Sequence, residues 1–435
     1  MRSILTLIVV GAFSFLVGCS GSGGGSTPVG VPTPTPTGEN IVPISVNGGP
    51  LVSANPPQDY INGAFVSVNI CLPGTSTCQT IDNVLLDTGS FGLRLLASQV
   101  TINAPAITDG SGDTLNDCVQ FLDNSFLWGE VASVDVKMGG EVASSTPVQL
   151  ISTPTGYLIP TGCTGTNEDT QATLGANGIL GVGPEPFDCG EGCDGADNTS
   201  GTPPPVYYLC STANGCTATF VSCGAICNDT AANAQVTNPV FNFTSDNNGV
   251  IVELPAVNST AASLSGSLIF GIGTQTNNAL GSAAVLQLNS SDNFTTVFSG
   301  QTLGSSFIDS GSNSYAFPNG IESNFTGGNI PICTTNTDFY CPASLTAFSA
   351  TNESGSVNSA VNFSVDNADN LFNNNSADFV FVNLAAPQGS GPCTGTTGAC
   401  TFDWGLPFFY GRNVYTAIDG ATPPTGVPAG PFEAY

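Results

Sequence analysis

Two short segments of this 435-residue chain match each other, and they constrain its fold more than any other feature. Residues 84–90 read VLLDTGS and residues 306–312 read SFIDSGS, so each is an apolar run that ends in Asp-(Thr/Ser)-Gly-Ser. The two aspartates, Asp87 and Asp309, are 222 residues apart (309 − 87). This pattern indicates two related lobes that each contribute one carboxylate to a shared site. The chain is long enough for two such lobes and a sizeable core.

Two carboxylates that are forced together cannot both ionise, so one keeps its proton while the other becomes a base. Such a pair activates a water molecule without a metal, a histidine or a covalent nucleophile. Taken singly, Asp-Thr-Gly and Asp-Ser-Gly are also ordinary β-turn sequences, and a turn is the alternative for each aspartate. Because the two segments match and both follow apolar strands, we predict that Asp87 and Asp309 form a catalytic dyad.

The composition excludes several other chemistries. The chain has no histidine, which removes Ser-His-Asp triads, Cys-His pairs and His-ligated metal sites. Its net charge of −28 arises from 32 acidic and only 4 basic residues, so almost nothing could neutralise the phosphates of a nucleic acid. We therefore expect no nucleic-acid partner, no metal and no cofactor. Once the carboxylates protonate, few charges remain to repel one another, so this composition suits a protein that works in acid. The alternative explanation of the composition is that it keeps an exported protein soluble.

The N-terminus has the pattern of an export signal. Residues 1–18 combine a positive start with an apolar run, and residues 16–19 read LVGC, which resembles a bacterial lipobox. Cleavage there would leave Cys19 lipidated, whereas an ordinary secretory signal is the alternative. Ser20 after the cysteine favours the outer membrane or cell surface of a bacterial envelope. Residues 19–40 are rich in Gly, Ser, Thr and Pro, and are predicted to tether the domain to the membrane.

Fourteen cysteines remain when Cys19 is set aside, an even number that predicts disulfides in an exported chain. They group in sequence as Cys71 with Cys78, Cys118 with Cys163, six within residues 189–227, Cys333 with Cys341, and Cys393 with Cys400. The spacings Cys189-x3-Cys193 and Cys223-x3-Cys227 leave a zinc cluster as an alternative. The connectivity within the block of six stays open.

Beyond residue 40, short runs rich in Val, Ile, Phe and Thr alternate with Gly, Asn, Asp and Pro turns, which predicts an all-β fold. Residues 93–100 and 319–324 are the stretches expected to form short helices. We expect one lobe over residues 41–276 and another over residues 277–435. A cysteine-rich stretch at about residues 187–228 interrupts the rhythm and is predicted to be an insertion on the first lobe.

Three further segments resemble the pepsin-like aspartic proteases. Residues 178–183 (GILGVG), 265–271 (SGSLIFG) and 404–419 (WGLPFFYGRNVYTAID) follow the order of that family together with the two aspartate segments. The resemblance spans roughly residues 60 to 420. It implies a bilobal fold of two related β-barrel-like lobes with the active cleft between them. It also implies an aspartic endopeptidase that cleaves polypeptides at acidic pH, most simply as a monomer.

The same resemblance assigns supporting roles to six residues that follow the aspartates: Thr88, Gly89, Ser90, Ser310, Gly311 and Ser312. It implies that Thr88 and Ser310 brace one loop against the other, and that the glycines permit the tight turns. The last serine of each segment would hydrogen-bond the outer carboxylate oxygen. The chain is also similar to a bacterial family of pepsin-like exported proteins of unassigned function, through residues 118–123 (CVQFLD), 128–131 (WGEV) and 403–409 (DWGLPFF).

Two departures from the pepsin-like pattern stand out. Where that family has a flap tyrosine that closes over substrate, this chain has Phe121 or Leu122, and Trp128 is a second flap candidate. Pro407 is expected to replace the glycine of the second apolar-apolar-Gly segment. These departures favour the alternative of a catalytically inactive pepsin-like surface lipoprotein that binds a peptide, glycan or protein partner. A surface adhesin without peptidase ancestry is a further alternative.

Overall fold

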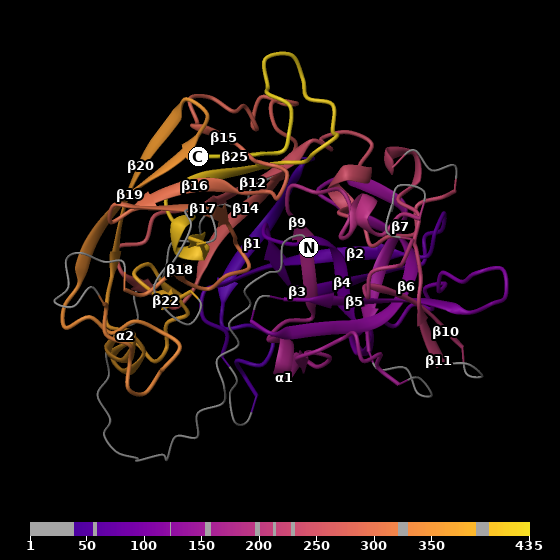
Figure 1. Cartoon of the computed structure of the whole chain (residues 1–435), viewed down its shortest axis with the longest axis horizontal. Helices are drawn as coiled ribbons and strands as arrows, with labels where there is room; N and C mark the ends of the chain where they lie inside the picture. Colours follow the sequence, from indigo (N-terminus) through magenta and orange to yellow (C-terminus); the bar gives the residue numbers. More distant parts are fainter. Residues whose placement is uncertain are drawn as a thin grey trace.

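The computed structural model describes residues 39–54, 59–121, 123–152, 158–195, 201–211, 215–227, 231–320, 329–388 and 400–435. Strands predominate in these segments, and the two α-helices there are only four and seven residues long. The structure confirms the all-β prediction, and Figure 1 shows two β-rich lobes side by side. Residues 1–38, which include Cys19 with the signal and most of the tether, lie outside the described residues, as does Leu122.

The first lobe is built from hairpins of adjacent strands. Its elements are β2 (Gly63–Cys71), β3 (Cys78–Asp87), β4 (Phe91–Leu96), η1 (Ala97–Gln99), β5 (Thr114–Gln120), β6 (Ser125–Met138), β7 (Glu141–Ile151), β8 (Thr166–Asn167), α1 (Gln171–Leu174), β9 (Gly178–Val182), η2 (Gly190–Gly192), β10 (Tyr207–Ser211), β11 (Gly215–Ala218), η3 (Gly224–Cys227) and η4 (Pro239–Asn242). Within it, β9 lies parallel to β3 and antiparallel to β4, which in turn lies parallel to β7. Every residue of β9 (GILGV) is buried, because a strand with neighbours on both sides and packing on both faces requires an uninterrupted apolar run.

The second lobe repeats this arrangement. Its elements are β16 (Phe294–Phe298), β17 (Gln301–Ile308), β18 (Tyr315–Phe317), β19 (Thr346–Ser354), β20 (Val357–Val365), α2 (Ala368–Asn374), β21 (Val380–Phe381), β22 (Ala385–Pro387), β23 (Asp403–Trp404) and η5 (Leu406–Phe408). Here β23 lies parallel to β17 and antiparallel to β18, which lies parallel to β22. The strand orders β3-β9-β4-β7 and β17-β23-β18-β22 therefore correspond, and both aspartate segments end the first strand of the set.

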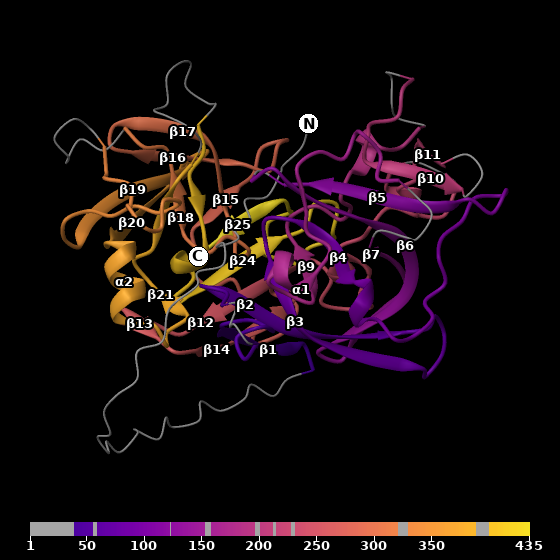
Figure 2. The same ribbon diagram turned by 90° about the horizontal axis from the view of Figure 1, so that it is seen from below.

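A shared sheet joins the two lobes. It contains β1 (Ile41–Asn47), β14 (Leu264–Phe270), β12 (Gly249–Leu254), β24 (Arg412–Ala417), β25 (Phe432–Ala434) and β15 (Val285–Gln287), in that order, while β13 (Thr260–Ala261) pairs with β21. Strands from before and after residue 277 are neighbours in this sheet, since β12 pairs with β24. Figure 2 shows these strands running between the lobes.

Aromatic side chains form much of the core beneath the second aspartate segment. The ring of Phe298 lies 5.2 Å from that of Phe317 and 5.6 Å from that of Phe402, centroid to centroid. Phe402 in turn stacks on Trp404 of β23 at 4.0 Å. Large rings bury much apolar area and have few rotamers, so this cluster holds β17, β18 and β23 in fixed positions.

Six disulfides connect twelve of the described cysteines to one another. They are Cys71–Cys78, Cys118–Cys163, Cys189–Cys193, Cys210–Cys216, Cys223–Cys227 and Cys333–Cys341. Three pairings expected from sequence grouping are confirmed, and the block of six pairs locally. Cys400 is also disulfide-bonded, whereas Cys393 lies outside the described residues. These disulfides replace the zinc cluster that the sequence left as an alternative. The four cysteines concerned pair as Cys189–Cys193 and Cys223–Cys227, and a sulfur atom in a disulfide cannot bind zinc as a thiolate.

The short helix predicted for residues 93–100 is wrong. Residues Phe91–Leu96 form β4, and only Ala97–Gln99 form a single 3-10 turn. All six positions of β4 are buried, because the strand lies between β7 and β9. Tertiary pairing thus overrides the local preference. Of the second predicted helix, residues 321–324 lie outside the described residues. In the described part of the chain, no helix has the length and apolar character needed to cross a membrane.

Candidate active site

The matching segments deliver their aspartates to one point between the lobes. β3 ends at Asp87, and β17 ends at Ile308, one residue before Asp309. Both aspartates are fully buried, with 0% of their surface exposed. The apolar residues 84–86 before Asp87 are buried as well, and so is Ile308 before Asp309, while Phe307 is half-buried. Each carboxylate is therefore anchored by a strand that cannot shift without opening the core.

The loops after the two strands hydrogen-bond to each other. Thr88 Oγ1 donates to the carbonyl of Ile308 (3.1 Å) and accepts from the Ser310 N–H (3.0 Å). Reciprocally, Ser310 Oγ donates to the carbonyl of Leu86 (2.8 Å) and accepts from the Thr88 N–H (3.1 Å). This symmetric set of four bonds fixes the separation of the loops, and it matches the bracing expected of Thr88 and Ser310.

Each carboxylate is held by donors from its own loop. They are Gly89 N–H to Asp87 Oδ1 (2.8 Å), Ser90 Oγ–H to Asp87 Oδ2 (2.5 Å), Gly311 N–H to Asp309 Oδ1 (2.7 Å) and Ser312 Oγ–H to Asp309 Oδ2 (2.8 Å). The Oδ1 atoms thus take backbone donors and the Oδ2 atoms take serine hydroxyls. Both carboxylates are oriented before any ligand arrives.

The two carboxyl groups also interact directly. Burial, and then the nearby charge of Asp309, raise the pKa of Asp87 well above its ordinary value. Burial also raises the pKa of Asp309, and the interaction with Asp87 offsets part of that rise. One proton between two buried carboxyls is the state that this coupling favours.

Close approach of the loops requires glycine at position 311. A Cβ atom there would lie 2.7 Å from both Cγ and Oδ1 of Asp87, and 3.1 Å from Asp309 Oδ1. Carbon atoms at that distance overlap strongly, so any side chain at Gly311 would push the carboxylates apart.

The glycine that passes behind the second aspartate loop is Gly405, and the expectation for Pro407 is corrected. Ile308 pairs with Trp404, just as Leu86 pairs with Leu180 in the first lobe, so Gly405 corresponds to Gly181. A Cβ on Gly405 would lie 2.1 Å from the carbonyl oxygen of Ser314. Pro407 instead lies in the first turn of η5, where its fixed φ and missing N–H are tolerated.

This register brings in an acidic residue that the sequence analysis did not single out. Asp403 pairs with Phe307, at the position that Ile179 occupies in the first lobe. It is fully buried, and its Oδ2 lies 2.6 Å from Ser312 Oγ. Burial, and then the charge of Asp309, raise the pKa of Asp403 well above its ordinary value. The sequence did contain a signal for this residue. Residues 403–405 (DWG) correspond to residues 179–181 (ILG) of the first lobe, and an acid stands where the first lobe has its first apolar residue.

A second such acid is Glu433 of β25. Both of its carboxylate oxygens accept from the Ile308 N–H, each at 3.2 Å, directly before Asp309. Burial raises the pKa of Glu433 well above its ordinary value. Nothing local marks this residue in the sequence, because the shared sheet alone brings β25 under the end of β17.

The flap candidate Phe121 lies at the tip of a hairpin. β5 and β6 pair antiparallel from Asn116 opposite Glu130 to Gln120 opposite Phe126, and the Phe121 N–H bonds to the Ser125 carbonyl at 2.9 Å. Phe121 shares a buried cluster with Tyr60, which precedes β2.

Tyr60 was also missed by sequence reasoning. Burial, and then the charge of Glu168, raise the pKa of Tyr60 well above its ordinary value, and both aspartates of the pair add to this effect. Its hydroxyl has no hydrogen-bond partner among the described residues. Tyr60 is therefore a buried phenol with an unpartnered hydroxyl within electrostatic range of both carboxyls.

The other flap candidate, Trp128, packs in a different cluster. Its indole is fully buried and meets the ring of Tyr208 edge-on at 5.6 Å. The cysteine-rich stretch that contains Tyr208 extends the first-lobe sheet, because β10 pairs with β5. Buried Arg94 of β4 ties the same region to the lobe through ion pairs with Asp117 and, at 2.9 Å, Asp188.

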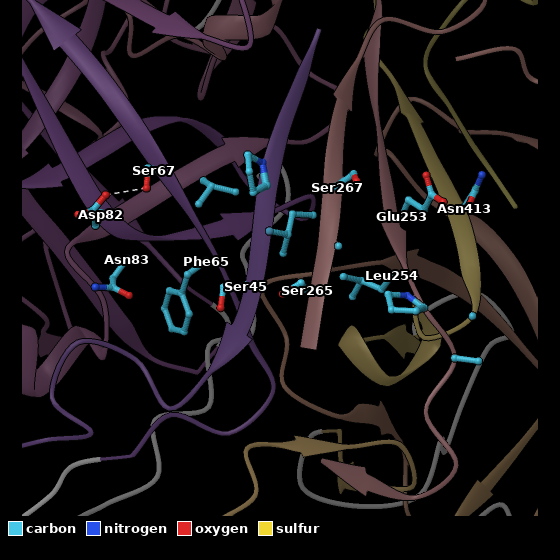
Figure 3. A pocket seen from close by; sticks show the side chains of 17 residues that line it. Ser45, Phe65, Ser67, Asp82, Asn83, Glu253, Leu254, Ser265, Ser267 and Asn413 are labelled. Carbon is cyan, nitrogen blue, oxygen red and sulfur yellow. Dashed lines mark hydrogen bonds between the residues drawn. The ribbon is translucent and has the colours of Figure 1, made fainter. Parts of the chain in front are cut away.

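A cavity of about 750 Å³ lies away from the aspartate loops, on the shared sheet (Figure 3). Its lining includes Ser45 of β1, Ser267 of β14, Glu253 of β12 and Asp82 of β3. None of its lining residues belongs to the loops that carry Asp87 and Asp309.

Comparison with known proteins places these observations in a family. Among solved structures, the chain is similar to the aspartic proteinase from Irpex lacteus, with 17% sequence identity and a TM-score of 0.46; the match covers 87% of this chain and 93% of that chain. No curated protein is similar enough in sequence to count as a match. A family model described as "Protein of unknown function (DUF3443)" matches residues 36–435, and the chain therefore belongs to that family.

Proposed function

We propose that this protein is an aspartic endopeptidase that hydrolyses peptide bonds with Asp87 and Asp309. The observation that carries the proposal is one pair of fully buried carboxyls on loops that brace each other. Oxygens of both carboxyls lie within 3.1 Å of the place that a Cβ atom at Gly311 would occupy. Such a pair is costly to build, because two buried acids repel each other unless they share a proton. Function is the most direct reason to keep it.

In the proposed reaction, a water molecule binds between the two carboxyls. Ionised Asp309 takes a proton from the water as its oxygen attacks the scissile carbonyl carbon. Protonated Asp87 donates its proton to the carbonyl oxygen, which gives a neutral tetrahedral diol. In the collapse of the diol, Asp309 donates the proton that it took from water to the leaving nitrogen, and Asp87 takes back a proton from one diol hydroxyl. The C–N bond breaks, and the products are a carboxylic acid and an amine.

The pair works only while it holds one proton. At low pH both carboxyls are protonated and no base remains, whereas at high pH both are ionised and no acid remains. We therefore expect a bell-shaped dependence of kcat/KM on pH, with its maximum in the acidic range.

Both aspartates are fully buried, so a substrate reaches them only if neighbouring residues move. Phe121 and Tyr60 share a buried cluster with Leu85, two residues before Asp87. We propose that the β5–β6 hairpin with Phe121 opens to admit an extended polypeptide, and that the Tyr60 hydroxyl then bonds to the substrate. Trp128 keeps the base of this hairpin rigid through its packing against Tyr208.

A second candidate is an inactive pepsin-like lipoprotein that binds a peptide, glycan or protein partner. The full burial of both aspartates favours it, because a ligand cannot reach them without rearrangement. The cavity on the shared sheet would then be the place to look for a ligand (Figure 3).

We also propose that the protein is exported to the bacterial cell envelope and anchored through a lipid on Cys19, at the outer membrane or cell surface. The disulfides support an oxidising compartment, since they rarely persist in the cytosol.

The test is proteolysis of an unfolded protein substrate from pH 2 to 7 by the chain without its first 19 residues, with and without a statine-type inhibitor. Inhibitor-sensitive cleavage below about pH 5 is expected. Asp87→Asn and Asp309→Asn should each lower kcat/KM by roughly 10²–10⁴-fold. Asp82→Asn, an exposed position on the same strand as Asp87, is the matched control and should cleave normally.

Absence of cleavage at every pH, from protein with a cooperative thermal transition and intact disulfides, would overturn the endopeptidase proposal. The binding-protein candidate would then take its place.

A further inference from the structure

One serine hydroxyl lies between two buried carboxyls. Ser312 Oγ is 2.8 Å from Asp309 Oδ2 and 2.6 Å from Asp403 Oδ2. A hydroxyl carries a single proton, so it can donate to only one of these oxygens. A carboxylate oxygen cannot donate. The second contact is therefore a hydrogen bond only if one of the two carboxyls is itself protonated.

The surroundings of Asp403 identify it as the protonated group. It is fully buried on β23, and its Oδ1 has no hydrogen-bond partner among the described residues. The charged groups that act on it are Asp309 at the end of β17, Asp87 at the end of β3 and Glu433 on β25, all of them acids. With no positive charge among these neighbours, the ionised form of Asp403 would be strongly disfavoured.

Asp309 has the opposite environment. The Gly311 N–H and the Ser312 hydroxyl both point at its oxygens, and bonds of this kind favour a carboxylate. We propose that Asp403 donates its proton to Ser312 Oγ, that Ser312 donates in turn to Asp309, and that this chain makes Asp309 the ionised member of the pair. Asp403 is then a positioning residue that keeps its proton throughout.

The first lobe lacks this device. Ser90 donates to Asp87 Oδ2 in the same way, but the position that corresponds to Asp403 holds Ile179, which offers no donor. The two loops are otherwise matched. The difference at this position therefore breaks the symmetry between the carboxyls, and it leaves the shared proton on Asp87.

The inference rests on the proposed function only for its catalytic consequence, so its test does not require turnover. The protein is labelled with ¹³C at the aspartate Cγ atoms, and the carboxyl signals of Asp87 and Asp309 are followed against pH by NMR. Assignment uses Asp87→Asn and Asp309→Asn. The quantity compared is the lower apparent pKa of the coupled pair.

Asp403→Val removes the donor at nearly constant volume, and it should raise this apparent pKa by about one unit, because the Asp309 carboxylate loses a relayed hydrogen bond. Asp403→Asn keeps a neutral donor that can reach Ser312, and should restore the wild-type value within about 0.3 unit. Ile179→Val is the matched control in the first lobe and should leave the value unchanged.

If Asp403 were ionised, both Asp403 variants would remove a negative charge and lower the apparent pKa, so a downward shift overturns the proposal. Equal shifts in Asp403→Asn and Asp403→Val, or no shift in either, also overturn it. Should Asp403→Val fail to fold, Ser312→Ala breaks the same chain with Asp403 in place and is expected to give the upward shift.

Peptide cleavage by the same samples separates the two proposals. The expected titration pattern without any cleavage would support the hydrogen-bond chain and reject the endopeptidase. Cleavage without the titration pattern would do the reverse.

Discussion

The hydroxyl of Tyr60 is buried near the aspartates and has no hydrogen-bond partner among the described residues. Such a group costs stability, since it lost its bonds to water on folding. We predict that Tyr60→Phe leaves the free energy of unfolding unchanged or raises it by up to about 1 kcal/mol, yet lowers kcat/KM by roughly tenfold. Urea unfolding and the cleavage assay measure the two effects. Tyr207→Phe is the control: the Tyr207 hydroxyl donates to Asp188 (2.6 Å) and accepts from the Val236 N–H (2.7 Å), so its loss should destabilise the fold. Destabilisation by Tyr60→Phe would contradict the prediction.

At the scale of elements, the parallel pairing of β23 with β17 decides which residue passes behind the second aspartate loop. Gly405 lies against the Ser314 carbonyl there, whereas Pro407 lies in the first turn of η5. We predict that Gly405→Ala destabilises the protein by roughly 3 kcal/mol or more, because its methyl group would meet backbone that is fixed by the sheet. Pro407→Gly should cost only about 1 kcal/mol, through greater freedom of the unfolded chain. Thermal unfolding of the two variants at one pH compares them. A larger loss for Pro407→Gly would mean that the register found for β23 is wrong.

For the whole molecule, buried acids make stability depend on pH in an unusual direction. Burial, and then the charge of Asp123, raise the pKa of Glu168 to about 8, and the pKa values of Asp403 and Glu433 are also raised. In the unfolded chain these groups titrate near pH 4. Their stabilising effect is therefore present below about pH 4, and it is lost as the pH rises through the folded-state values. With only 4 basic residues, self-repulsion in acid stays small.

We accordingly predict that the thermal midpoint falls by roughly 5 °C or more between pH 4.5 and pH 8, which corresponds to a loss on the order of 2–4 kcal/mol. Glu168→Gln removes one of the titrating groups and should reduce that loss. Scanning calorimetry across this range measures both proteins. A midpoint that rises toward pH 8, as in proteins stabilised by ionised carboxylates, would refute this account.

Local chemistry in the sequence determined several parts of this protein. The turn sequences around Asp87 and Asp309 follow apolar strands, so each loop was predictable from its own residues, and so were the short disulfides such as Cys71–Cys78. Short apolar runs that alternate with turn residues predicted an all-β chain, because the pattern that marks a strand involves only residues that are close in the sequence. The repetition of one segment 222 residues later was enough to indicate two related lobes.

Only the tertiary structure decided what surrounds the aspartates. Residues 91–96 became a strand because their backbone pairs with β7 on one edge and with β9 on the other. The register of β23 selected Gly405 and brought Asp403 to Ser312. Tyr60 and Glu433 reach the site from distant parts of the chain. Burial and strand pairing are properties of residues that meet in space, so no local pattern encodes them. The aspartates could be read from the sequence, but the groups that set their proton could not.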